Sequence, residues 1–129
     1  MGVRMLVAAS GRTGELVVRG DGPGLLQLAD AILSGNHHVE TSAMADVAPY
    51  DEALSGIRIT ACTRPTTRVG KQADGTMIIS GPSSGLRILA DNMRALAESD
   101  TSGHHLHIEY FPGHFYLDHE STPLVVELG

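Results

Sequence analysis

Histidines are the residues of this 129-residue chain whose type and spacing could do chemistry. Seven are present, and five of them fall within residues 104–119. The segment 104–111 reads as a β-strand, in which alternate side chains share a face. His105, His107 and Glu109 would then lie side by side, and two imidazoles with a carboxylate are a suitable ligand set for zinc or iron. The same spacing also describes an ordinary solvated strand face, so both interpretations stay open.

Most of the aromatic side chains gather around one turn, Pro112-Gly113. Aromatic residues on a loop are frequent anchors of protein interfaces. The alternative is that they close one end of the hydrophobic core. The predicted partner-binding residues are Tyr110, Phe111, His114, Phe115 and Tyr116.

Two amphipathic helices must position these residues. The first is predicted over residues 23–34 and ends at Gly35, and the second follows Pro82 and ends before residues 99–103. Each carries apolar residues at helical spacing on one face. The apolar residues are Leu25, Leu28, Ala29 and Ile32 in the first helix, and Leu86, Leu89, Ala90, Met93, Leu96 and Ala97 in the second.

The two helices belong to segments that resemble each other at a fixed offset, because residues 14–32 align without a gap on residues 75–93. The sequence therefore predicts a single domain, 1–129, that contains a duplicated ββαβ unit. The pseudo-repeats span about 2–42 and 56–111, and a final strand covers 123–128. The predicted fold class is α+β, with one mostly antiparallel sheet of about seven strands and both helices on one face.

The connections between these elements are predicted from turn residues and from weak apolar patterning. Residues 3–9 and 15–19 form a first hairpin, and a third strand covers 37–42. Residues 43–50 form a loop, followed by a helical turn near 51–54. Residues 64–75 form a long hairpin link between strands at 56–62 and 76–80.

Composition narrows the range of partners. The net charge of −6 and the presence of one lysine, Lys71, argue against a nucleic-acid-binding protein. No apolar run is long enough for a membrane helix, and no signal peptide is visible, so we expect a cytoplasmic protein. Cys62 is the single cysteine, which excludes an internal disulfide, and no catalytic motif surrounds it.

The C-terminal stretch resembles a known family. The sequences His105-Leu-His-Ile-Glu-Tyr-Phe-Pro-Gly-His-Phe-Tyr-Leu-Asp and Ser121-Thr-Pro-Leu-Val-Val-Glu are similar to those of the bacterial immunity protein 32 family. Members of that family are thought to neutralise a cognate toxin in polymorphic toxin systems. The resemblance implies a binding protein that blocks a toxin by contact, and it identifies no catalytic residue.

Two functional hypotheses follow. The first is a non-enzymatic, partner-binding protein of immunity type, whose acidic surface would suit a basic toxin. The second is a small metal-binding protein or metal-dependent enzyme that uses His105, His107 and Glu109, with zinc as the cofactor. A homodimer through an exposed sheet edge is a further option.

Overall fold

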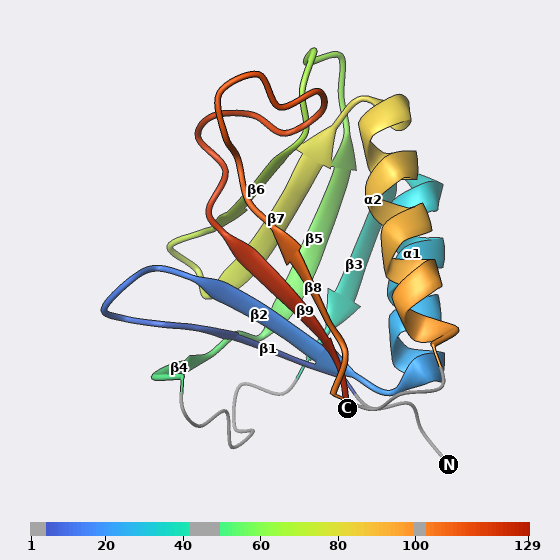
Figure 1. Ribbon diagram of the computed structural model, residues 1–129. Coiled ribbons are helices and arrows are strands. Elements are labelled where there is room, and N and C mark those ends of the chain that lie inside the picture. Colours follow the sequence, from blue (N-terminus) through green and yellow to red (C-terminus); the bar gives the residue numbers. More distant parts are fainter. Residues whose placement is uncertain (1–4, 42–49, 100–102) are drawn as a thin grey trace.

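A computed structural model describes residues 5–41, 50–99 and 103–129 of the chain (Figure 1). No helix in these ranges is long and apolar enough to cross a membrane. The helices are α1 (Gly22–Ser34) and α2 (Ser83–Ala97). The strands are β1 (Met5–Ala9), β2 (Leu16–Gly20), β3 (Asn36–Glu40), β4 (Glu52–Ala53), β5 (Gly56–Ala61), β6 (Arg68–Lys71), β7 (Thr76–Gly81), β8 (His105–Ile108) and β9 (Leu124–Leu128).

Both predicted helices are confirmed, and their apolar faces form the centre of the core. Every residue of the two predicted apolar faces is buried. The Asp21 carboxylate caps α1 by accepting a 2.8 Å hydrogen bond from the Gly24 N–H. Gly35 ends α1 with a φ of +85°, a left-handed conformation that glycine adopts without a steric penalty. Local sequence signals therefore determine where α1 begins and ends.

The prediction of one mostly antiparallel sheet of about seven strands is wrong. The described residues form a five-stranded sheet with the order β4-β1-β2-β9-β8 and a four-stranded sheet with the order β3-β5-β7-β6. Both sheets are mixed, because β2 runs parallel to β9 and β5 runs parallel to β7. Helices α1 and α2 lie together on one side of the two sheets (Figure 1), and the main core fills the space between the helices and the sheets. The broader prediction of an α+β fold is correct.

Each helix carries the chain from one sheet to the other. The chain passes from β2 in the five-stranded sheet through α1 to β3 in the four-stranded sheet, and from β7 through α2 back to β8. The same order of pairing occurs twice: antiparallel, parallel, antiparallel along β1-β2-β9-β8 and along β6-β7-β5-β3. Neither half therefore completes a sheet alone, and the duplication with its limits at 2–42 and 56–111 stays a prediction.

Two connections differ from the predictions. The segment 64–75 is not a simple link, because it contains β6, which pairs antiparallel with β7. Residues 52–53 form β4 against β1 instead of a helical turn. Apart from Tyr50, the predicted loop 43–50 lies outside the described residues. Short polar segments carry little periodicity, so strand pairing at these positions depends on the neighbouring strand.

Strand β6 reaches the first turn of α2 through Thr67, the residue just before it. The Thr67 side chain is fully buried, and its hydroxyl has no hydrogen-bond partner in the described structure. A Cβ atom at Gly85 would lie 2.0 Å from the Thr67 Oγ1, and one at Gly81 would lie 2.6 Å from it. Glycine at position 85 of α2 and at position 81, the end of β7, therefore lets both elements approach Thr67 closely.

Candidate functional site

A long connection between β8 and β9, residues 109–123, crosses from the five-stranded sheet to the open edge of the four-stranded sheet. We call it the strap; Figure 1 shows it in orange and red beside β6. The Thr67 N–H donates to the Tyr116 C=O at 2.7 Å, and the Asp118 N–H donates to the Thr67 C=O at 2.8 Å. The Thr122 N–H donates to the Val69 C=O at 2.8 Å. These bonds cover the outer edge of β6 and hold the strap in place.

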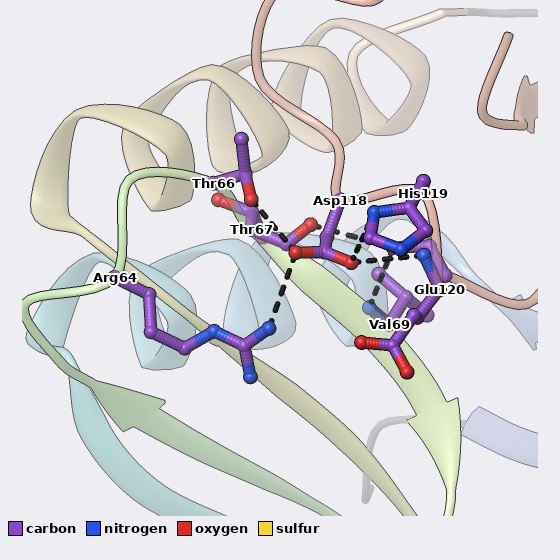
Figure 2. A network of polar contacts seen from close by, with 8 residues as sticks. Arg64, Thr66, Thr67, Val69, Asp118, His119 and Glu120 are labelled. Carbon is purple, nitrogen blue, oxygen red and sulfur yellow. Dashed lines mark hydrogen bonds and ion pairs between the residues drawn. The ribbon is translucent and has the colours of Figure 1, made fainter. Parts of the chain in front are cut away.

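The Asp118 carboxylate is the main side-chain anchor of the strap (Figure 2). Its Oδ1 accepts a 2.8 Å bond from the Glu120 N–H, and its Oδ2 accepts bonds from the Thr66 hydroxyl at 2.9 Å and from Arg64 Nη2 at 3.1 Å. Hydrogen bonds from the Glu120 N–H, the Thr66 hydroxyl and the Arg64 guanidinium lower the pKa of Asp118, although partial burial opposes the shift. Asp118 is therefore an anion near neutral pH, as an acceptor of several hydrogen bonds should be.

The anchored strap presents two phenylalanines to solvent. The Phe111 residue is 58% exposed and the Phe115 residue is 75% exposed. In the described part of the chain, the other exposed large hydrophobic residue is Leu33, on α1, at 43%. Exposed aromatic residues on a held loop are typical of binding surfaces. We call the segment Tyr110–Tyr116 the aromatic tip.

The His114 side chain packs against the exposed rings of the aromatic tip and binds the tip's backbone. The centroid of its ring lies 4.8 Å from that of Phe111 and 5.6 Å from that of Phe115. Its Nδ1 accepts hydrogen bonds from the backbone N–H groups of Tyr116 at 3.3 Å and Leu117 at 3.1 Å. These donors assign the neutral tautomer with the proton on Nε2. His114 therefore fixes the turn and supports both phenylalanines.

The two tyrosines of the tip face the protein interior. Tyr116 is 8% exposed, and burial raises the pKa of its hydroxyl, although a side-chain hydrogen bond with Asn92 of α2 opposes the shift. Tyr110 is half-buried against the main core. The five predicted partner-binding residues therefore divide into two exposed residues, Phe111 and Phe115, and three that are partly or fully buried beside them, Tyr110, His114 and Tyr116.

The predicted metal ligands lie apart from this network. His105 and His107 are exposed on β8 with their ring centroids 6.2 Å apart, while Leu106 and Ile108 point toward the core. Glu109 lies beyond the end of β8, because the strand is shorter than predicted. Zinc binding by His105, His107 and Glu109 stays a prediction, and metal analysis of untagged protein purified without chelator tests it.

A different group of possible metal ligands occurs in the described residues, at Asp118, His119 and Glu120, whose ligand atoms lie within 4.8 Å of one another. The Asp118 oxygens are already occupied by hydrogen-bond donors, including the Arg64 guanidinium, whose positive charge opposes a cation. The arrangement therefore suits an anchor for the strap better than a metal centre. The sequence offered one local signal for it, an Asp carboxylate that bonds the N–H two residues later.

Comparison with known proteins shows that the strap lies in a segment that matches a known protein family. The family model of immunity protein 32 matches residues 76–129, which contain β7, α2, β8, the strap and β9. The match confirms the resemblance seen in the C-terminal sequence. Comparisons with curated proteins and with solved structures gave no match.

Proposed function

We propose that this protein binds a cognate bacterial toxin in the cytoplasm and neutralises it by contact, without catalysis. The observation that carries the proposal is the exposure of Phe111 and Phe115 on an anchored loop inside the segment matched by the immunity protein 32 family. The match supports an immunity-type function, and the geometry supports the aromatic tip as the contact surface.

The aromatic tip is suited to binding because its loop is already ordered before a partner binds, so binding costs little conformational entropy. Phenylalanine supplies a large apolar area with few rotatable bonds, so its immobilisation costs little conformational entropy. Asp118 and His114 hold the loop before binding. Pre-organisation of this kind preserves more of the contact energy as affinity.

Charge around the tip favours a basic partner. Residues 95–129 contain six aspartates and glutamates and no lysine or arginine. Glu109 and Glu120, which flank the tip in the sequence, are both exposed. Opposite charges across an interface accelerate association and select against wrong partners. A toxin surface rich in lysine and arginine would therefore suit this region.

The decisive experiment is co-expression with the protein encoded by the neighbouring reading frame, followed by growth and co-purification assays. Truncation of an interface hot spot typically costs 2 kcal/mol or more, so we expect Phe111→Ala and Phe115→Ala each to weaken binding by about 30-fold. Leu33→Ala is the matched control, because it removes an exposed apolar side chain outside the tip. Binding by the Phe111→Ala/Phe115→Ala double variant at the level of Leu33→Ala would contradict the assignment of the tip. No association and no protection from toxicity would contradict the immunity function itself.

A further inference from the structure

Among the described strands, β8 has a pairing partner on one side of its backbone. It is the outermost strand of the five-stranded sheet and pairs on one side with β9. The Leu128 N–H donates to the His104 C=O at 2.9 Å, which fixes the alternation of bonded and non-bonded pairs along this ladder. Leu106 and Ile108 therefore pair with β9, while the backbone N–H and C=O groups of His105 and His107 point outward.

The outer strands of the two sheets are not equally available. The strap covers β6, and β4 contains two residues. In the described structure, β3 and β8 therefore remain as the edge strands available for strand addition. Like β3, strand β8 holds neither a proline nor a lysine, two devices that commonly block strand addition at an edge. It also leads directly into the aromatic tip, with Phe111 three residues beyond Ile108.

Exposed acidic residues flank β8 in the sequence. Glu98, at the end of α2, precedes β8 by seven residues, and Glu109 follows β8 directly. Both are exposed, and neither takes part in an ion pair within the described residues. The Ser99 hydroxyl lies 2.9 Å from His104 Nδ1, which places the end of α2 beside the start of β8. Strand β3 carries an exposed acidic residue too, Glu40, and Arg58, opposite His38, is paired with Asp74 at 3.7 Å, so the position of β8 beside the aromatic tip distinguishes the two edges. The exposed carboxylates of Glu98 and Glu109 would suit a basic segment at β8.

We propose that an extended segment of the toxin, carrying lysine or arginine, adds to the five-stranded sheet along β8. It would exchange hydrogen bonds with the outward backbone groups of His105 and His107, and its basic side chains would face Glu98 and Glu109. This inference rests on the proposed function and adds the mode of binding: backbone pairing at β8 provides a second contact beside the aromatic tip.

Residue-resolved amide hydrogen exchange by NMR tests the proposal on the intact chain, alone and in complex with the protein encoded by the neighbouring reading frame. In the free protein, the amides of His105 and His107 should exchange faster than those of Leu106 and Ile108. In the complex, exchange at His105 and His107 should slow by about 10-fold or more, because each N–H gains an acceptor. A complex without this protection would overturn strand addition while leaving the immunity function intact. Failure to form a complex would remove both proposals.

A pair of proline variants provides the second measurement. His107→Pro removes an outward N–H without removing a bond to β9, and the loss of one intermolecular hydrogen bond should weaken toxin binding by about 10-fold. His107→Ala retains the N–H and should bind nearly as well as the unmodified protein. His38→Pro is the matched control on β3, because the Ala61 N–H bond to Gly35 C=O places the His38 N–H on the open edge. Equal toxin affinities of His107→Pro and His38→Pro would overturn the proposal. Protection of the His105 and His107 amides that rises with the concentration of the free protein would also overturn it, because it would assign the β8 edge to a second copy of this chain.

Discussion

Replacing Asp118 by alanine should loosen the strap from the four-stranded sheet and lower the free energy of unfolding by about 2 kcal/mol. The Asp118 side chain is 12% exposed and accepts bonds from the Glu120 N–H and the Thr66 hydroxyl at 2.8 and 2.9 Å. Each of these two bonds should contribute about 1 kcal/mol. The Arg64 side chain is 40% exposed, so its ion pair should add less than about 1 kcal/mol.

Urea denaturation at pH 7 measures this loss, with Glu120→Ala as the matched control. Glu120 is exposed, and the bond it makes to Asp118 uses its backbone N–H, which alanine retains. The control should therefore change the free energy of unfolding by less than about 0.5 kcal/mol. Equal losses for Asp118→Ala and Glu120→Ala would refute the anchoring role of the carboxylate.

Three further predictions concern the same part of the molecule. The folded-state pKa of Asp118 lies below its ordinary value of 3.8. The stabilising contribution of Asp118 should therefore be complete above about pH 5 and disappear as the pH falls through the folded pKa. In urea titrations, the difference in unfolding free energy between the unmodified protein and Asp118→Asn should shrink accordingly below about pH 4. Thr67→Val should raise the free energy of unfolding by about 1 kcal/mol, because it replaces a buried hydroxyl without a partner by a methyl group of similar size; destabilisation in the same assay would contradict this. Gly85→Ala should lower the free energy of unfolding by about 1–3 kcal/mol despite the helix preference of alanine, since the new Cβ would lie 2.0 Å from the Thr67 Oγ1. In a double-mutant cycle, Thr67→Ala should recover part of this loss. Additive losses would count against the steric explanation.

The sequence by itself determined the elements with strong local signals. Helical spacing of apolar residues identified both buried helix faces, and Gly35 identified the end of α1. The Pro112-Gly113 turn and the resemblance of the C-terminal stretch were also readable, because both depend on neighbouring residues.

Only the tertiary structure decided how the strands combine and which residues form the site. Alternating burial shows that a segment has an inner face, but it does not identify the strand beside it, so the parallel pairs β2–β9 and β5–β7 and the separation into two sheets were not predictable. Likewise, Asp118 depends on Thr66 and Arg64, which lie more than 50 residues earlier. No local pattern records such a contact, because it exists only after the strap has folded against β6.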